Sequence, residues 1–530
     1  MSTNSLEQMN NNVGMAQPRV SVAVVENQKN WQWINNNDFY SIIPAPYYSF
    51  YNNWVRLWLY WADGYVPWVH GTSTGLLSTN IGSMIINKAT DCVYGGNLMF
   101  TNARKPLITI VQDDGKTVGK ALDFISNDWS KVADLKAKIK LAIKYAFAGG
   151  FSLLKLNKHN GELWVDSLRA DRFYCARTSR GEIRKCVSIL SFYEDLTPSK
   201  SNAKKYVLVE ERRFEPLGMF GEEIPVVEYK IYESSTPVQY LSGVKDSFVK
   251  WEQLPKCIKE AFKSEYSFML NKPQAMNGFS DLGVYMLKGS EDVTNVPQIN
   301  LGESLLANVL NYLYEYDFYN TCFNTDMYLA RGRVLVPKYM QGVGAKNNPP
   351  SKALEDFAYT LVDSPNPDAT QPEAIQFELR ASDWKEARNT LLENISTNIG
   401  LSVSTIASYL QDGSNRTARE VSAEENATTL FVENNRRRFE TPINALLKAV
   451  LRFYGYVDDV EIRWSRAGMS NQTVLVDTLT KALNAGLIDN KTAVSQFNYD
   501  NDEEQNNEIL INVEKEKAQQ QNSLFGGGGI

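Results

Sequence analysis

A five-residue segment near residue 70 has the spacing of a catalytic serine. Gly71-Thr72-Ser73-Thr74-Gly75 matches the G-x-S-x-G pattern, in which a sharp turn exposes the serine hydroxyl. Such a serine needs a histidine as its general base, and the sequence contains only His70 and His159. His159 alone follows the serine, beside a predicted hairpin turn. A plain polar loop is the simpler interpretation, and a serine hydrolase using Ser73 stays open as an alternative.

A second segment has part of the spacing of a phosphate-binding loop. Gly115-Lys116-Thr117 matches the end of the G-x-x-x-x-G-K-[ST] pattern, but Ile110 stands where the first glycine belongs. That glycine lets the backbone N–H groups close around the phosphates. We therefore exclude nucleotide hydrolysis by this segment.

The residues that bind metals are sparse and scattered. The five cysteines are Cys92, Cys175, Cys186, Cys257 and Cys322. They form no C-x-x-C pair, and neither an H-E-x-x-H motif nor a D-x-D-x-D-G calcium loop occurs. The sequence predicts neither a disulfide framework nor a metal site, and it indicates no cofactor and no catalytic residue. We expect a structural or mechanical protein rather than an enzyme.

Composition limits the classes of protein further. The chain has 530 residues, 43% of them hydrophobic, which is enough for a packed core and for three to four domains or one large composite subunit. Lys and Arg number 55 against 61 Asp and Glu, a net charge of −6. This balance argues against a tight grip on nucleic acid but permits a protein that encloses DNA and lets it slide. The most apolar stretch, at residues 54–61, is too short to span a membrane and contains Arg56, so we expect an intracellular protein.

The first 300 residues predict a mixed α+β region, with helices first and a sheet after them. Residues 1–30 are expected to be a flexible arm. The aromatic residues of 31–75 indicate core or interface packing, with base stacking as the alternative. Apolar periodicity predicts helices at 80–94 and 129–148. The predicted strands are 151–157 and 162–168, joined at Asn160-Gly161, then 186–193, 205–214 and 226–232.

One face of the second predicted helix carries three lysines. Lys136, Lys140 and Lys144 recur at intervals of four residues. A solvated face is the simpler interpretation of such a stripe, and contact with phosphate or an acidic partner is the alternative.

The C-terminal 230 residues are mainly helical in pattern. Residues 303–328 predict a helix, although alternating aromatic residues at 312–318 leave a local strand possible. Helices are further expected at 352–361, 383–399, 417–454, 472–485, 491–497 and 502–520, with short strands at 333–337 and 460–464. Asp383 with Glu386, and Thr417 with Glu420, have capping-box spacing. Pro442 is expected to kink the long helix.

The order of these segments resembles portal proteins of tailed bacteriophages. In that family an inner stem helix, a tunnel loop and a helix beginning T-A-x-E-[VI] follow one another, as do 383–399, a polar loop and Thr417-Ala418-Arg419-Glu420-Val421. Residues 146–153 followed by Asn160-Gly161 are similar to the family's helix, small-residue break and hairpin. Residues 478–488 with Thr492-Ala493 are similar to its C-terminal helical region.

The resemblance implies a division of the chain into the parts of a portal subunit. The fold class expected is α+β, with an α+β wing, a two-helix stem, a small α/β clip, a long kinked wing helix and a helical crown. The implied limits are a wing at 31–302, an outer stem helix at 303–328, a clip at 329–381, an inner stem helix at 383–399, a tunnel loop at 400–416, a wing helix and strand at 417–469, a crown at 470–520 and a flexible tail at 521–530.

The resemblance also implies a site and partners. The residues expected to face DNA are Gln411, Asp412, Ser414, Asn415 and Arg416 of the tunnel loop, and Glu386, Arg388 and Glu393 of the inner stem helix. The implied assembly is a homo-oligomeric ring, a dodecamer, around double-stranded DNA. Its implied partners are the terminase large subunit, the major capsid or scaffolding protein, and head-completion or tail adaptor proteins, without a membrane.

The implied location is the portal vertex of the virion, after assembly in the host cytoplasm. A different phage head or tail adaptor protein stays open as an alternative.

Overall fold

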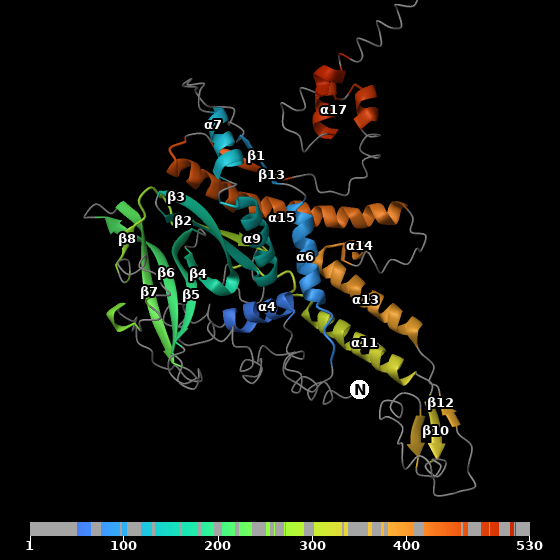
Figure 1. Cartoon of the computed structure of the whole chain (residues 1–530). Helices are drawn as coiled ribbons and strands as arrows, with labels where there is room; N and C mark the ends of the chain where they lie inside the picture. Colours follow the sequence, from blue (N-terminus) through green and yellow to red (C-terminus); the bar gives the residue numbers. More distant parts are fainter. Residues whose placement is uncertain are drawn as a thin grey trace, which may run out of the picture.

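The computed structural model has an α+β body from which a pair of helices projects toward a small sheet (Figure 1). The residues that the structure describes are 50–64, 76–95, 98–102, 118–129, 133–159, 161–177, 182–195, 204–217, 222–235, 251–254, 259, 270, 272–290, 301–330, 333–337, 359–362, 373–375, 380–406, 418–456, 459–464, 479–486, 488–497, 509–513 and 515. Helices and sheets alternate along the chain, so the predicted α+β class is confirmed.

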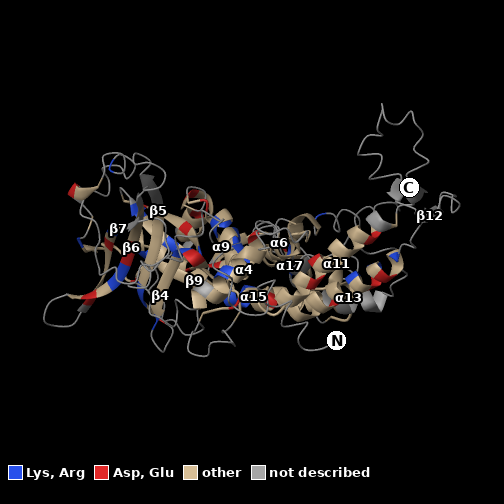
Figure 2. Ribbon diagram, turned by 90° about the horizontal axis from the view of Figure 1, so that it is seen from below, with Lys and Arg blue, Asp and Glu red and all other residues tan. Residues whose placement is uncertain are grey.

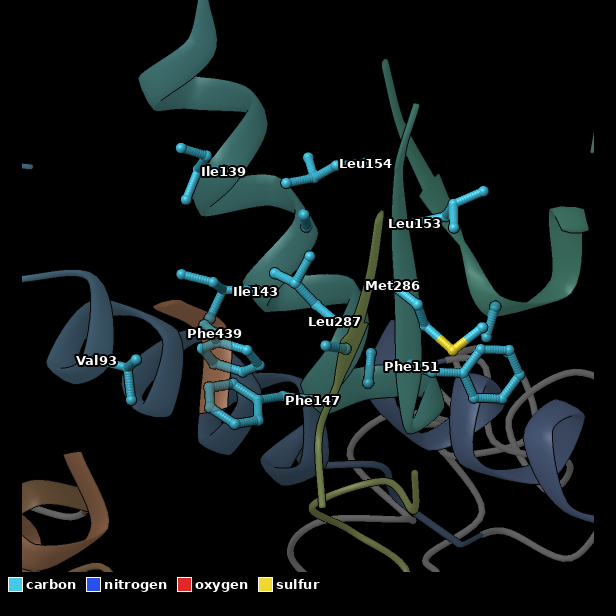
Figure 3. Close-up of a cluster of buried hydrophobic side chains, with 14 of the residues drawn as sticks. Val93, Ile139, Ile143, Phe147, Phe151, Leu153, Leu154, Met286, Leu287 and Phe439 are labelled. Carbon is cyan, nitrogen blue, oxygen red and sulfur yellow. The ribbon is translucent and has the colours of Figure 1, made fainter. Parts of the chain in front are cut away.

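The centre of the body is helix α9 packed on a three-stranded sheet. Helix α9 (Leu135–Gly149) leads into strand β2 (Phe151–His159), which pairs antiparallel with β3 (Glu162–Arg169) and with β9 (Val284–Lys288). Gly161 has φ +87°, as the tight turn of the predicted hairpin requires. Figure 3 shows Ile139, Ile143 and Phe147 of α9 near the apolar side chains of the strands. The hairpin prediction is confirmed.

A second, five-stranded sheet lies beside this centre. Its order is β4-β5-β6-β7-β8, and every neighbouring pair is antiparallel. The strands are β4 (Phe173–Arg177), β5 (Ile183–Asp195), β6 (Lys204–Leu217), β7 (Glu222–Ser235) and β8 (Gln274–Ala275). The three strands predicted at 186–193, 205–214 and 226–232 are therefore present, each longer than its prediction.

Helices from both ends of the chain cover the core. The elements are α4 (Arg56–Asp63), α6 (Ile81–Tyr94) and the long α15 (Ala418–Phe453), with β1 (Leu98–Asn102) paired antiparallel to β13 (Val460–Trp464). Phe147 of α9 contacts Phe439 of α15, with ring centroids 5.7 Å apart. Because these residues lie far apart in the sequence, the core joins the two halves of the chain.

Helices α11 (Leu310–Leu329) and α13 (Ala381–Ile399) form the projecting pair. At its far end lies a three-stranded sheet of β10 (Arg333–Pro337), β11 (Tyr359–Val362) and β12 (Glu373–Ile375), in the order β11-β10-β12 (Figure 1). Strand β10 is parallel to β11 and antiparallel to β12. The predicted strand at 333–337 is confirmed.

Shorter elements complete the described chain. They are η2 (Tyr51–Val55), α7 (Val118–Asp123), η3 (Phe124–Trp129), η4 (Ala170–Arg172), η5 (Trp251–Gln253), α14 (Val403–Ile406) and α17 (Asn490–Phe497). Residues 479–484 and 509–513 are also helical, within the predicted C-terminal helices. No helix among the described residues is both long and apolar enough to cross a membrane.

The predicted start of the first stem helix, at residue 303, is wrong. Helix α11 begins at Leu310, and residues 305–309 form turns. The N–H groups before it have partners elsewhere: Glu303 N donates to Ser290 Oγ at 2.6 Å, and Leu305 N to the Phe147 carbonyl at 3.0 Å. Because these groups bond to the body, the segment docks on the end of α9 instead of extending the helix. The alternating aromatic residues of 312–318 are helical, so the local strand alternative is also wrong.

Three other predicted boundaries are wrong for similarly local reasons. Trp129 belongs to the π-helical turn η3, and α9 starts only after Asp134, whose φ of +48° interrupts the helical path. Residues 359–361, predicted to end a short helix, belong to strand β11. Asp383 lies inside the first turn of α13, whose N-cap is Arg380 without a side-chain hydrogen bond. The predicted capping box of α13 is therefore absent.

Candidate functional site

The projecting pair α11 and α13 occupies the place of the predicted stem helices. The two helices are joined near their outer end by Asp326 of α11. This carboxylate accepts hydrogen bonds from Trp384 Nε1 at 2.7 Å and Arg380 Nη2 at 2.8 Å. These hydrogen bonds, first from Trp384 and then from Arg380, lower the pKa of Asp326 below its ordinary value. Asp326 is thus held as an ionised anchor between the helices.

Aromatic contact strengthens the same junction. The ring of Tyr319 lies edge-on to that of Trp384, with centroids 5.6 Å apart, and the Arg380 guanidinium lies 5.5 Å from the Trp384 ring. Nearer the body, Leu391, Leu392 and Ile395 of α13 are buried. The pair is therefore fixed to the core at one end and clamped by mixed polar and aromatic contacts at the other.

The three predicted stem residues lie on two different faces of α13. Glu386 and Glu393 are both exposed and seven residues apart, so they lie on one side of the helix. Arg388 is three residues before Leu391 and seven before Ile395, which places it on the packed side. Its Nε is buried and has no hydrogen-bond partner among the described residues. The structure therefore groups Glu386 with Glu393 and separates Arg388 from them.

Two threonines complete the exposed strip of α13. Thr390 and Thr397 are exposed and alternate with the two glutamates on the same face. Their hydroxyls donate to the backbone carbonyls of Glu386, at 3.0 Å, and Glu393, at 2.8 Å. The strip of Glu386, Thr390, Glu393 and Thr397 contains carboxylates and hydroxyls but no cation (the helices are coloured by charge in Figure 2). We call it the acidic strip.

Part of the segment predicted as the tunnel loop, 400–416, is helical. Gly400 ends α13 with φ +82°, and its N–H bonds to the Ser396 carbonyl at 2.9 Å. Residues 403–406 then form α14, whose Ile406 is buried. Ser402 N donates to Thr428 Oγ1 of α15 at 3.0 Å. The segment from Gly400 to Ile406 is therefore fixed against the body.

The remaining predicted loop residues lie outside the described residues. These are Gln411, Asp412, Ser414, Asn415 and Arg416. The chain leaves the described structure after Ile406 and re-enters it at Ala418, the first residue of α15. Ser73 and the rest of its G-x-S-x-G segment also lie outside the described residues, as does Gly115-Lys116-Thr117.

At least one member of the lysine stripe on α9 pairs within the chain. Lys140 Nζ lies 2.9 Å from Asp91 Oδ1 of α6 and 5.6 Å from the centre of the Tyr94 ring. Both partners belong to the neighbouring helix. Lys140 therefore links two helices of the body, which favours the simpler of the two interpretations of the stripe.

Sequence reasoning missed a buried charge network between the two sheets. Lys155 of β2 is 1% exposed, and its Nζ lies 3.2 Å from Glu210 Oε2 of β6 and 3.5 Å from Ser188 Oγ of β5. Arg212 Nε lies 2.6 Å from Glu210 Oε1. The signal available was a lysine inside the apolar run of β2, where a charge needs a buried partner.

The same network holds the backbone of the central sheet. Arg212 Nη1 donates to the carbonyls of Leu156, at 2.8 Å, and Leu282, at 3.0 Å. Burial raises the pKa of Glu210, but the charges of Arg212 and Lys155 outweigh it and bring that pKa below its ordinary value. Glu210 therefore stays ionised and fixes the five-stranded sheet to the central one. We call Lys155, Glu210 and Arg212 the buried network.

Among the described residues, no group of His, Cys, Asp and Glu is arranged to hold a metal ion. The distinctive parts are an α+β body, a projecting helix pair with a small sheet at its end, and a long helix that returns to the body. These parts define an α+β chain with a projecting helix pair.

The comparisons with known proteins identify the family. The family model described as "Phage portal protein, SPP1 Gp6-like" matches residues 198–522. The chain belongs to this family of phage portal proteins, and the prediction of a portal function is confirmed. Among curated proteins, none matches the chain.

Two solved structures are similar to the chain at low identity. One is titled "Neck of native GTA particle computed with C12 symmetry", with 12% identity, a TM-score of 0.40, and coverage of 79% of this chain and 89% of that one. Another is titled "Neck of empty GTA particle computed with C6 symmetry", with 11% identity, a TM-score of 0.39, and coverage of 78% and 88%.

Proposed function

We propose that copies of this chain form a closed ring at the vertex of a phage capsid, through which double-stranded DNA enters and leaves. Membership of the portal family is the observation that carries the proposal. In this ring α13 is the inner stem helix, α11 the outer one, and the small sheet of β10, β11 and β12 is the docking end. The ring is dodecameric, is assembled in the host cytoplasm, and acts without enzymatic activity of its own.

The acidic strip supports the assignment of α13 to the channel wall. Glu386 and Glu393 are exposed, and the strip between them offers hydroxyls and no cation. Phosphate binding depends on Lys and Arg, which release counterions from the DNA. A wall that repels phosphates instead lets the duplex slide. Arg388, on the packed face, is assigned to holding the helix rather than to DNA.

An exposed apolar strip on α11 supports contact with a neighbouring copy. Phe318 is 38% exposed and its ring stacks on that of Tyr314, with centroids 6.5 Å apart. Leu77 is 46% exposed, and its N–H donates to Thr321 Oγ1, one turn further along the helix. Closed rings use head-to-tail contacts, in which each such surface meets a different surface of the next copy. We assign Leu77, Tyr314 and Phe318 to that contact.

The segment 407–417 is assigned to the lumen, carrying Gln411, Asp412, Ser414, Asn415 and Arg416. Its two ends are set by α14, which is anchored on α15, and by the start of α15 itself. The assigned partners are the terminase large subunit during packaging, the major capsid or scaffolding protein around the ring, and head-completion or tail adaptor proteins afterwards. The runner-up function, a head or tail adaptor, has no feature in the described residues that favours it.

Electron microscopy of the purified chain tests the ring. We expect rings with a central hole for the wild type, and smaller species for Leu77→Asp/Phe318→Asp, because two charges in the contact disfavour association. Leu430→Asp is the matched control, since Leu430 is 60% exposed on α15, away from this strip. A wild type that stays monomeric at every concentration contradicts the proposal.

Replacement of 407–416 by a Gly-Ser segment of equal length tests the loop. The replacement keeps the span between α14 and the start of α15 and the contact with Thr428, so rings should assemble while DNA packaging or retention fails. Packaging at the wild-type level in a complementation assay contradicts the assignment of this segment to the lumen.

A further inference from the structure

Two of the cysteines face each other across neighbouring strands of the five-stranded sheet. Cys175 of β4 and Cys186 of β5 are directly opposite in the antiparallel register. Each is 2% exposed, and both are free thiols. The other described cysteines, Cys92 and Cys322, lie on helices α6 and α11. No sequence pattern predicted the pair, because no C-x-x-C spacing connects its members.

The register places the pair within the geometry of a disulfide. Residues directly opposite in antiparallel strands have Cα atoms about 4.5 to 5.5 Å apart, and disulfides span Cα distances of about 4.4 to 6.8 Å. A bond therefore needs side-chain rotation but no movement of the strands. Because the two residues are directly opposed, their side chains lie on the same face of the sheet.

We propose that Cys175 and Cys186 are a modification site, which a small-molecule disulfide such as oxidised glutathione converts into an intramolecular disulfide. The thiolate of one cysteine attacks the small molecule, forms a mixed disulfide and expels one glutathione thiolate. The second cysteine then attacks the mixed disulfide, the cross-strand bond forms, and a second glutathione thiolate leaves. Two protein thiols are oxidised, and one small disulfide is reduced to two glutathione thiolates, which take up the two protons that the cysteines release.

The position of β4 in the sheet explains how a buried pair becomes reactive. Strand β4 is at the edge of the sheet, with β5 on one side, and its register with β5 shifts at Ala176 and Arg177. An edge strand of five residues opens more easily than a central strand. Oxidation therefore waits for β4 to open. Once the bond has formed and β4 has closed, burial protects it from thiols in solution.

The chemistry of the site gives the reaction a pH dependence. Burial, followed by the hydrogen bond and the negative charge of Cys186, raises the pKa of the Cys175 thiol well above its ordinary value. In the closed strand the raised pKa keeps Cys175 protonated. After β4 opens, the thiolate is the attacking species and its share increases with pH, so exchange is slow near neutral pH and faster in alkaline solution. The two thiols stay reduced in a reducing cytoplasm and form the disulfide after exposure to an oxidising medium.

Tryptic mapping tests the proposal on the full-length protein. Trypsin cuts after Arg172, Arg177, Lys185 and Lys200, so the two cysteines fall in separate peptides, 173–177 and 186–200. After incubation with oxidised glutathione and blocking of free thiols, we expect these peptides as one linked species, two hydrogens lighter than their sum. The linked species should form faster at pH 9 than at pH 7.

Controls separate native geometry from random pairing. Cys92→Ser should keep the link, and Cys175→Ser should abolish it. Because Cys175→Ser removes a buried thiol and could unfold the sheet, the wild type oxidised in strong denaturant is the second control, and it should give mixed pairings instead of one. Glutathione adducts on Cys92 or Cys322 without any link between 173–177 and 186–200 would overturn the proposal.

Discussion

Two charged regions of this molecule use their charges in opposite ways. In the buried network, Lys155, Glu210 and Arg212 are each at most 3% exposed and hold two sheets together. In the projecting pair, the acidic strip of α13 is exposed, and the helices are joined by the single carboxylate of Asp326 with its aromatic neighbours. The charges of the buried network therefore stabilise the body, whereas those of the acidic strip are exposed to solvent. Equal substitutions in the two regions should have very unequal effects.

Removal of the buried lysine should have the largest effect on stability. Lys155→Ala leaves Glu210 paired with Arg212 alone and opens a space at Nζ, so we expect a loss of about 3 kcal/mol in the free energy of unfolding. Urea denaturation measures it. Lys140→Ala is the matched control, because Lys140 pairs at the surface, where such pairs contribute about 0 to 1 kcal/mol. Equal losses in the two variants would remove the contrast between the regions.

The same network should make the body sensitive to acid. The pKa of Glu210 is depressed in the folded state, so its contribution is fully present above the unfolded value of about 4.3 and is lost as the pH falls through the folded value. The stability difference between the wild type and Glu210→Gln should be constant from about pH 7 to pH 5 and shrink below about pH 4. A difference that grows toward acid would contradict this sign.

Loss of the aromatic contact between α11 and α13 should lower the free energy of unfolding by a smaller amount. It should affect only this helix pair. Trp384 is half-buried, so Trp384→Ala should cost about 2 kcal/mol, below the range for a fully buried tryptophan. Trp384→Phe keeps the contact with Tyr319 and loses only the hydrogen bond to Asp326, for about 1 kcal/mol. Hydrogen exchange should accelerate in α11 and α13 and not in α9. Faster exchange in α9 as well would mean that the projecting pair and the body unfold as one unit.

Neutralising the acidic strip should have the smallest effect on the fold. Glu386→Gln/Glu393→Gln should change the free energy of unfolding by no more than about 0.5 kcal/mol, because both side chains are exposed. If the strip lines the channel, Glu386→Lys/Glu393→Lys should make rings bind DNA with a steeper salt dependence. Glu315→Lys, on the exposed side of α11, is the control. An unchanged salt dependence in the α13 variant would place the strip away from the DNA.

Sequence patterns predicted helices and strands well where interactions between neighbouring residues determine them. Asn160-Gly161 predicted a tight hairpin, and alternation predicted β13 with both of its observed ends, Val460 and Trp464. Prediction failed where distant residues compete for the backbone. The N–H groups of Glu303 and Leu305 bond to Ser290 and Phe147, so α11 begins late even though the preceding residues suit a helix. The strand at 359–362 likewise forms because β10 pairs with it.

The sequence by itself determined the class of the molecule: an α+β chain with a hairpin after its central helix, a stem pattern resembling portal proteins, and no complete catalytic motif. These features depend on periodicity, turn chemistry and the order of segments, which are properties of the chain alone. Only the tertiary structure decided which face of α13 packs on the body, that Lys155 meets Glu210, and that Cys175 faces Cys186. Such contacts join residues from separate elements, and strand register and helix packing decide them only when the whole core assembles.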